Sequence, residues 1–189
     1  MQSQLMIKLT DLQNSRAVID DLADAYDFDI DRASRDYSWI RLSPEDKFLV
    51  IAGESTGGAF LAYGNGDHDR MPILYVTSEG RAGKVASNLT EFLAIVVAVP
   101  YWQDLLKFSG GGDLEEMRRS AELLQRNIDE EIVNRAKTHL MKALAIQDIP
   151  DPLGRFHHNV DTTDCTVVAE DGWQYESLFN TFSSRNLRR

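Results

Sequence analysis

The sequence predicts an α+β fold, with a single, mainly antiparallel sheet, helices packed on one face of it, a long C-terminal helix and a short hairpin-like tail. Short apolar runs between Tyr37 and Val76 are separated by tight turns, which is typical of an antiparallel meander. An apolar stripe at helical spacing precedes these runs. After a glycine triplet at residues 110–112, a second helical pattern runs from Asp113 to Gln147.

The first predicted helix runs from Asp11 to Tyr26 and can be capped by Thr10 or Asp11. One face is apolar and would pack on the sheet, whereas the other face and the exit are unusually acidic. This cluster indicates a solvated face or a partner surface. Its members are Asp20, Asp21, Asp24, Asp27, Asp29 and Asp31.

The sheet is expected to begin with Tyr37–Leu42, followed by a turn at Pro44. A strong turn signal of the hairpin kind lies at Gly64–Asp67. The further predicted strands are Phe48–Ala52, Ala59–Tyr63 and Ile73–Val76. Gly80 and Gly83 then predict an irregular segment. A buried helix follows, which starts after Asn88 and is broken by Pro100.

The helical pattern from Asp113 to Gln147 fits either one long helix or two helices with a kink near Glu130. The prolines after Asp148 end it, and a hairpin is expected from Thr166 to Tyr175 around the Asp171-Gly172 turn. We therefore predict a core at residues 1–109 and a helical extension with a C-terminal tail at residues 110–189, packed together as one domain.

Composition limits the function. The chain has 189 residues, a hydrophobic fraction of 43% and a formal net charge of −10. The acidic balance argues against nucleic-acid binding, which needs cations to displace counterions from phosphates, and against docking on an anionic membrane. It would steer a cationic protein partner toward the surface, although acidity for solubility alone is the simpler interpretation.

The chain carries a single cysteine, Cys165, so it can form neither an intrachain disulfide nor a cysteine zinc cluster. Its start, MQSQLMIKLT, lacks the features of a signal peptide. The apolar run Phe92–Pro100 is far shorter than the ~20 residues that a membrane-spanning helix needs. The predicted location is the cytoplasm.

One motif suggests catalysis. Gly53-Glu-Ser55-Thr-Gly57 matches the G-x-S-x-G nucleophile elbow of serine hydrolases. The elbow requires a helix after the serine, but AFLAYGNG has the pattern of a strand that ends in a turn. Coincidence is favoured, and no catalytic residue is predicted.

The motifs that suggest a metal or a cofactor also lack residues that such sites require. The Asp27-x-Asp29-x-Asp31 run resembles a calcium loop, but Arg32 stands where the loop needs glycine and Ser38 where it needs glutamate. A second group of possible ligands is better explained as a plain polar loop. That group comprises His157, His158, Asp161, Asp164 and Cys165. We predict no metal and no cofactor.

The remaining distinctive residues have structural explanations. Gly57 and Gly58 lack both a P-loop lysine and dinucleotide-binding spacing, so a bulge or a tight backbone approach explains them better. Trp39, Trp102 and Trp173 are expected in the core.

Three segments, FLVIAGESTGGAFLAYG, PILYVTSEG and GKVASNLTEFL, resemble the SUKH superfamily, the Smi/Knr-type domain. They contain a strand that enters a paired-glycine turn, a strand that ends in Ser78-Glu79-Gly80, and an alanine-serine step into a helix near Leu89. The resemblance covers Tyr37 to Trp102. The usual asparagine-glycine-glycine signature near the first strand is missing, which would place the chain in a divergent subgroup.

The resemblance implies helices packed on one face of a mainly antiparallel sheet and no catalytic residues. Many bacterial members are immunity proteins that neutralise delivered toxins, often nucleases or deaminases, and others are regulators or interaction modules. We therefore expect a non-enzymatic protein-binding domain, most simply an immunity protein that occludes a basic toxin domain. The alternatives are a regulatory module with a cellular partner, which could self-associate through the Asp113–Gln147 helix, and, more distantly, a serine hydrolase using Ser55.

Acidic residues on sheet loops are the candidate partner contacts, and glycines are the candidate turn residues. The contacts are Glu54, Asp67, Asp69 and Glu79, and the turn residues are Gly57, Gly58 and Gly80.

Overall fold

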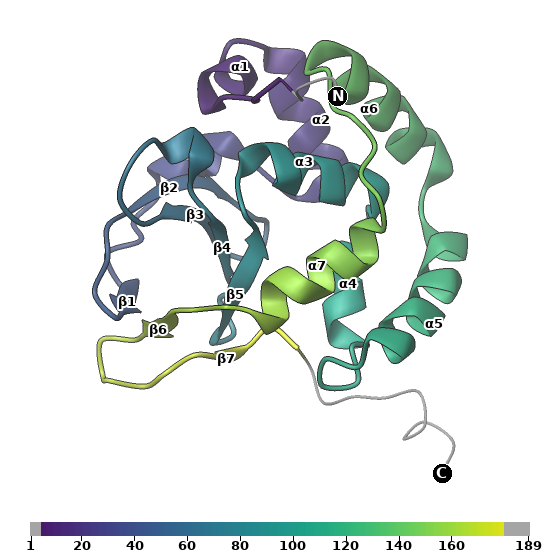
Figure 1. Cartoon of the computed structure of the whole chain (residues 1–189). Coiled ribbons are helices and arrows are strands. Elements are labelled where there is room, and N and C mark those ends of the chain that lie inside the picture. Colours follow the sequence, from purple (N-terminus) through teal and green to yellow (C-terminus); the bar gives the residue numbers. More distant parts are fainter. Residues whose placement is uncertain (1–4, 180–189) are drawn as a thin grey trace.

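Five strands form the central sheet, in the order β2-β3-β4-β5-β7, and β1 and β6 form a separate two-stranded ribbon (Figure 1). The computed structural model describes residues 5–179. Neighbouring strands are antiparallel except β5 and β7, which are parallel. The strands are β1 (Arg41–Ser43), β2 (Phe48–Gly53), β3 (Ala59–Tyr63), β4 (Ile73–Val76), β5 (Arg81–Ala86), β6 (Thr166–Val168) and β7 (Glu176–Ser177).

The two middle strands are buried on both faces. Every residue of β3 and β4 is buried. Because side chains alternate along a strand, Phe60 and Tyr75 point into one core whereas Leu61 and Leu74 point into another. Antiparallel sheets often leave one face to water, but this one needs a cover on each side.

Helices cover only one of these faces. Aromatic side chains of the helices and of β4 pack around Trp102, whose ring centroid lies 5.1 Å from that of Tyr75 and 6.0 Å from that of Phe156. Among residues 5–179, the core on the opposite face contains no helical residue and is closed by Leu42 of β1 and Val167 of β6. The mainly antiparallel sheet with helices that the sequence predicts is therefore confirmed.

The helices form an arc around the sheet (Figure 1). α3 and α7 contact β5, and the outer α6 packs on α2. Within residues 5–179, no helix is both long and apolar enough to cross a membrane. The α-helices are α1 (Leu9–Gln13), α2 (Arg16–Tyr26), α3 (Leu89–Ala98), α4 (Trp102–Lys107), α5 (Leu114–Leu124), α6 (Glu130–Ala143) and α7 (Pro152–Asp161). Short 3₁₀ turns are η1 (Ile30–Ser34), η2 (His68–Arg70) and η3 (Gln125–Asn127).

The long C-terminal helix predicted over Asp113–Gln147 is wrong. α5 ends at Leu124, η3 follows, and Ile128 is extended, with a ψ angle of 150°. The side chain of Asp129 then caps α6 by accepting a hydrogen bond from the Ile132 N–H at 3.2 Å. Two helices near Glu130, the alternative that the pattern left open, are what form, because an aspartate cap favours a new helix start.

Other sequence expectations were wrong in detail. The predicted Asp11–Tyr26 helix is divided after Asn14, and Ser15 caps the second part. The predicted Tyr37–Leu42 strand shrinks to β1, because the Ile40 N–H donates to the Tyr37 carbonyl at 3.0 Å and closes a turn.

Two elements were missed in regions predicted to be irregular. β5 forms across Gly83, where an added Cβ would lie 3.0 Å from Leu178. α7 forms where a polar loop was expected, with Asp151 as its cap and Pro152 in its first turn. The hairpin turn in the tail does form: the Ala169 N–H donates to the Trp173 carbonyl at 2.8 Å.

We predict that Gly58→Ala destabilises the fold by about 1–3 kcal/mol, because a new Cβ would overpack the end of β3. It would lie 2.5 Å from Glu54 Oε1 and 2.6 Å from the Val76 carbonyl oxygen. Urea unfolding measures the loss, with Ser78→Ala in the neighbouring exposed turn as the control. Equal stability of the two variants would contradict the tight approach at Gly58.

Candidate partner-binding site

A cavity of about 500 Å³ opens at the end of the sheet where the β2–β3 and β4–β5 turns meet, beside α4. Tyr75, Leu106 and Leu178 form an apolar wall. The charged lining residues include Asp27 and Glu79. An apolar floor with a charged rim can accept one long side chain of a partner.

Glu54, a predicted exposed contact, is buried, with only 1% of its surface accessible. Its carboxylate accepts hydrogen bonds from the Thr56 N–H at 2.5 Å, the Thr56 hydroxyl at 2.6 Å and the Gly58 N–H at 2.6 Å. The expectation of an exposed Glu54 is therefore wrong. The residue closes the β2–β3 turn, and a buried carboxylate is tolerated there because donors surround it.

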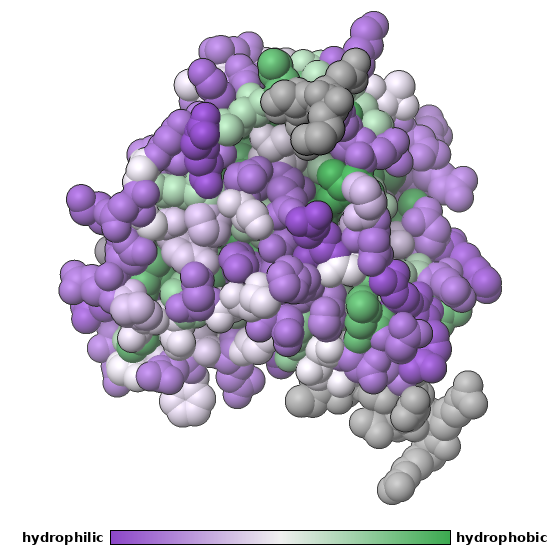
Figure 2. Space-filling view, in the orientation of Figure 1, coloured by the Kyte–Doolittle hydropathy of each residue, from purple (hydrophilic) through white to green (hydrophobic). Residues whose placement is uncertain are grey.

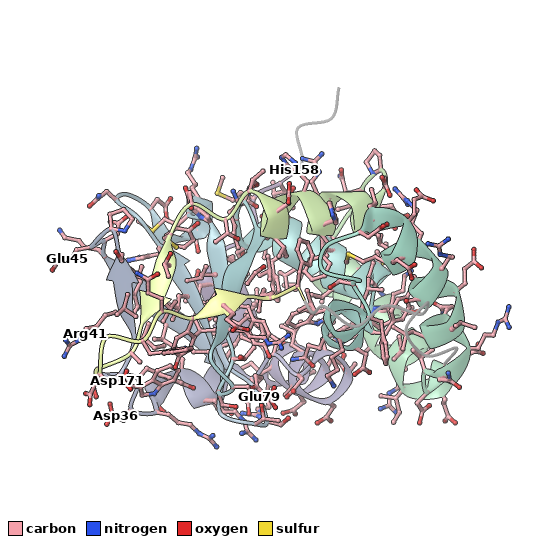
Figure 3. The ribbon with its side chains drawn as sticks, turned by 90° about the horizontal axis from the view of Figure 1, so that it is seen from below. Asp36, Arg41, Glu45, Glu79, His158 and Asp171 are labelled. Carbon is pink, nitrogen blue, oxygen red and sulfur yellow. The ribbon has the colours of Figure 1, made fainter. Side chains whose placement is uncertain are left out.

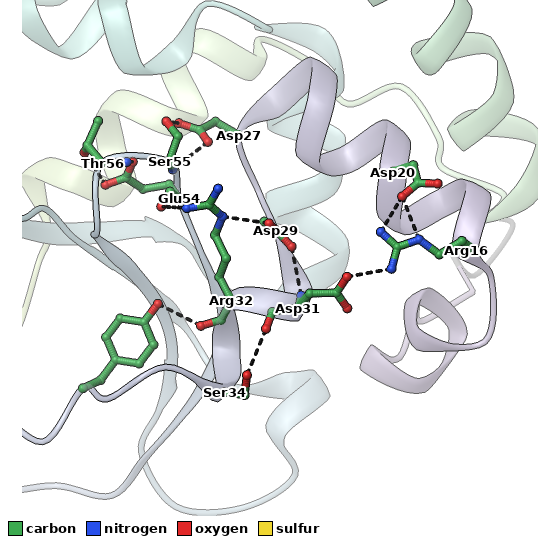
Figure 4. Close-up of polar contacts among 11 residues, drawn as sticks. Arg16, Asp20, Asp27, Asp29, Asp31, Arg32, Ser34, Glu54, Ser55 and Thr56 are labelled. Atoms are coloured by element: carbon green, nitrogen blue, oxygen red, sulfur yellow. Dashed lines mark hydrogen bonds and ion pairs between the residues drawn. The ribbon is translucent and has the colours of Figure 1, made fainter.

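A polar network ties the acidic end of α2 to this turn (Figure 4). Asp27, in the left-handed conformation at the end of α2, accepts hydrogen bonds from the N–H and the hydroxyl of Ser55, both at 2.8 Å. Arg32 bridges the carboxylate of Asp29 at 2.7 Å and the carbonyl of Glu54 at 3.3 Å. The network holds these carboxylates in fixed positions before any partner arrives.

Two further backbone hydrogen bonds strengthen this connection. Asp29 and Gly53 exchange N–H···O bonds of 2.9 Å in both directions. On the outer side of the same segment, Arg16 forms ion pairs with Asp20 and Asp31 (Figure 4). Asp27, Asp29 and Asp31 are not arranged as ligands of one calcium ion, because each of these side chains binds a different protein group.

The nucleophile elbow does not form around Ser55. A turn leads from β2 directly into β3, so the helix that the elbow requires is absent there. The hydroxyl proton of Ser55 points to Asp27 and not to a histidine. The geometry gives Ser55 a role in anchoring α2.

The predicted acidic contacts do not form one patch. In an antiparallel meander, the β3–β4 connection that carries Asp67 and Asp69 lies at the opposite end of the sheet from the turns of Glu54 and Glu79. Asp67 accepts from the Asp69 N–H at 3.2 Å, and Asp69 accepts from the Leu9 N–H at 2.8 Å. Of the four, only Glu79 is both exposed and on the cavity rim.

Asp24 and Asp27 were not named as contacts from the sequence, although both belong to the acidic run of α2. Asp27 lines the cavity, and Asp24 is exposed one turn earlier on the same helix. Together with Glu79 they form what we call the acidic edge. The signal for it was the spacing of the aspartates along α2, which places Asp20, Asp24 and Asp27 on one face.

Two of the three predicted turn glycines, Gly57 and Gly80, have the backbone conformations of turn residues, whereas Gly58 lacks a positive φ and instead lies close to Glu54 and the Val76 carbonyl. Gly57 has a φ of 105° and Gly80 a φ of 85°, in the left-handed region that favours glycine. Both lie in the turns that border the cavity. Substitution at either would therefore move the rim.

The histidine-cysteine group does not converge. Among residues 5–179 there is no cluster of three or more side chains able to hold a metal ion. His157 Nε2 lies 2.7 Å from the Gly112 carbonyl, which ties α7 to the glycine triplet. Cys165 is partly buried, and burial together with the Asp164 charge raises its pKa to about 11.

Two of the three tryptophans depart from the core position that the sequence predicts. Trp102 is in the core, with 1% of its surface exposed, but Trp39 is only partly buried and Trp173 is 64% exposed. Figure 2 shows a largely polar surface with scattered small apolar patches.

The chain matches no family model, and no curated protein or solved structure matches it. The resemblance to the SUKH superfamily therefore remains a prediction from the three segments quoted above.

We predict that Glu54→Ala destabilises the protein by about 2–3 kcal/mol, because buried N–H donors would lose a charged acceptor. Glu54→Gln should destabilise the protein by about half as much, since the glutamine amide oxygen can still accept hydrogen bonds. Glu79→Ala, at an exposed position, should change the free energy of unfolding by less than about 0.5 kcal/mol. Chemical denaturation measures all three; an unaffected Glu54→Ala would refute the turn-closing role.

We predict slow alkylation of Cys165 by iodoacetamide at pH 8, about a hundredfold slower than in the unfolded chain, because only the thiolate reacts. The raised pKa means that the proton is held to higher pH, so the rate should keep rising to about pH 11. A folded-state rate that levels off near pH 8.5, the ordinary value for a free thiol, would contradict this environment.

Proposed function

We propose that the chain is a cytoplasmic, non-enzymatic protein-binding domain of the SUKH type, and that it neutralises a basic nuclease- or deaminase-type toxin domain by occluding it. The observation that carries the proposal is the acidic edge: Asp27 and Glu79 line a preformed cavity, and the exposed Asp24 lies one turn earlier on α2. The hydrogen bonds of Asp27 fix this edge to the β2–β3 turn.

The distribution of charge supports a cationic partner. The chain has 30 acidic residues against 20 basic ones. All the acidic residues lie within the described part of the chain, and of these only Glu54 and Glu116 are buried. The excess negative charge is therefore at the surface, where it can accelerate encounter with a basic protein.

The rim is not uniformly acidic, which favours a protein over a simple cation. Lys107 lines the cavity, but it is paired with Asp104 at 2.9 Å. Arg81 also lines the cavity, as does the apolar Leu178. A partner surface with a long basic side chain and a nearby carboxylate would complement this arrangement.

Co-expression with a panel of cytotoxic nuclease and deaminase domains tests the proposal. The chain should restore growth against at least one basic toxin domain and bind that domain in equimolar ratio. Absence of rescue across the panel, with stable binding to a metabolic or envelope protein instead, would reject the immunity function and favour the regulatory alternative.

Reversal of charge at the acidic edge should slow association. We predict that Asp24→Lys with Glu79→Lys lowers the association rate constant for the neutralised toxin domain about tenfold at low salt, with a smaller effect at high salt. Glu122→Lys with Glu131→Lys, exposed on α5 and α6, is the control of equal charge change. Surface plasmon resonance measures both; equal slowing by the two pairs would mean that only net charge matters and not the acidic edge.

A further inference from the structure

The hairpin after β6 presents an exposed tryptophan on an ordered backbone. Trp173 is 64% exposed, its N–H donates to the carboxylate of Asp171 at 3.0 Å, and its carbonyl accepts from the Ala169 N–H at 2.8 Å. The Tyr175 N–H returns to the Val167 carbonyl at 2.8 Å. The indole is thus displayed by both strands of a hydrogen-bonded turn.

Other aromatic rings extend this surface. In a strand, residues two apart share a face, so Trp173 and Tyr175 lie on the same side of the hairpin. The ring of Tyr175 stacks on that of Trp39, with 6.3 Å between centroids and 21° between planes. We call the exposed Trp173 and the partly buried Trp39 and Tyr175 the aromatic patch. Tryptophan and tyrosine are enriched at binding hot spots.

Carboxylates surround the patch. Glu170 and Asp171 lie in the hairpin turn and Glu176 follows it, all exposed. The hydrogen bond from the Trp173 N–H places the Asp171 carboxylate beside the patch. Burial, with a contribution from the charge of Asp171, raises the pKa of Tyr175. Two cations lie near: Arg81 is in register with Glu176, whereas Arg41 is paired with Val168, which also pairs with Gln174, so Arg41 lies on the opposite face of the ribbon from Trp173 and Tyr175.

The patch also continues into the acidic edge. Glu176 is in register with Arg81, and its N–H donates to the Gly80 carbonyl at 2.9 Å, immediately beside Glu79. Figure 3 shows Glu79, Asp36 and Asp171 on one side of the molecule and His158 on the other. One side of the molecule therefore combines an exposed indole, supported by two partly buried rings, with exposed carboxylates.

We propose that the aromatic patch is the anchor for a lysine- and arginine-rich segment of the partner, a conclusion that rests on the proposed protein-binding function. An indole face attracts ammonium and guanidinium groups, and the flanking carboxylates pair with the same charges. The carboxylates disfavour a nucleic acid, whose bases could stack on the rings but whose phosphates would be repelled.

NMR titration of the full chain tests this without any toxin. The probe is a 12-residue peptide of alternating arginine and glycine at low salt, compared with peptides that carry glutamate or serine in place of arginine. The indole N–H signal of Trp173 should shift and saturate with the arginine peptide alone. The chemical shift of the buried Trp102 indole N–H should not change, which makes it an internal control.

Variants sharpen the test. Trp173→Ala should weaken binding of the arginine peptide at least tenfold, and Leu123→Ala, at a 59% exposed position on α5, should not change it. The Trp102 signal reports in every variant that the fold is kept.

Other outcomes would overturn the proposal. Equal binding of the serine peptide would make the patch a purely apolar surface, and an unmoved Trp173 signal would show that basic segments do not bind there. Tight binding of a neutralised toxin that is unaffected by Trp173→Ala would reject the anchor but leave the proposed function intact. A failed growth test together with a positive peptide titration would reject the proposed function but leave the aromatic patch as a binding site for basic segments.

Discussion

The burial of β3 and β4 on both faces is the constraint on which the rest of the structure depends. A strand with water on one side can alternate polar and apolar residues, but Ala59–Tyr63 and Ile73–Val76 are apolar throughout. Each face must therefore be covered by another layer. The helices supply one cover, and the β1–β6 ribbon supplies the other.

This need for two covers explains the integration of the C-terminal segment. β6 completes the ribbon, β7 extends the sheet beside β5, and α7 packs on β5 and α3. The helix-side core combines residues on both sides of the glycine triplet, from Phe60 and Phe92 to Phe156. A protein that lacked these later elements would leave apolar strand faces in water.

The sequence predicted the sheet well where hydrophobic pattern and turn chemistry agree. The strand that ends at Tyr63 and the helix that starts at Leu89 are confirmed, and Asn88 caps that helix by accepting from the Glu91 N–H at 2.9 Å. The Glu91 carboxylate accepts from the Ser87 N–H at 2.6 Å, one residue earlier than a capping box would place it. Local rules of this kind need no knowledge of the tertiary structure.

The failures have tertiary causes. Gly80 and Gly83 suggested a loop, but Gly83 lies within β5, where Leu178, far away in sequence, packs closely against it. Asp151-Pro152 was interpreted as the end of one helix, although the same pair starts α7. Charge alone likewise could not separate Glu54 from Glu79, because only the fold shows which carboxylate faces the donors of its own turn.

Glu54 and Asp27 stabilise the same turn in different ways, which links stability to function. Glu54 accepts hydrogen bonds from donors inside the β2–β3 turn, whereas Asp27 accepts hydrogen bonds from Ser55 on the outside of that turn. Asp27 of the acidic edge is thus held by a turn that the core already orders. Because little ordering is left to be done at binding, less of the interaction free energy is lost as conformational entropy.

The same reasoning applies to the hairpin beside it. Its base is fixed by Val167 in the ribbon core and by Leu178, which is buried against Gly83. The residues between these two anchors are the ones that carry the exposed indole and its flanking carboxylates. The chain segment that the buried strands require for cover is therefore also the segment that brings aromatic and acidic groups next to the sheet's acidic end, so selection for a stable core and for a binding face would act on the same residues.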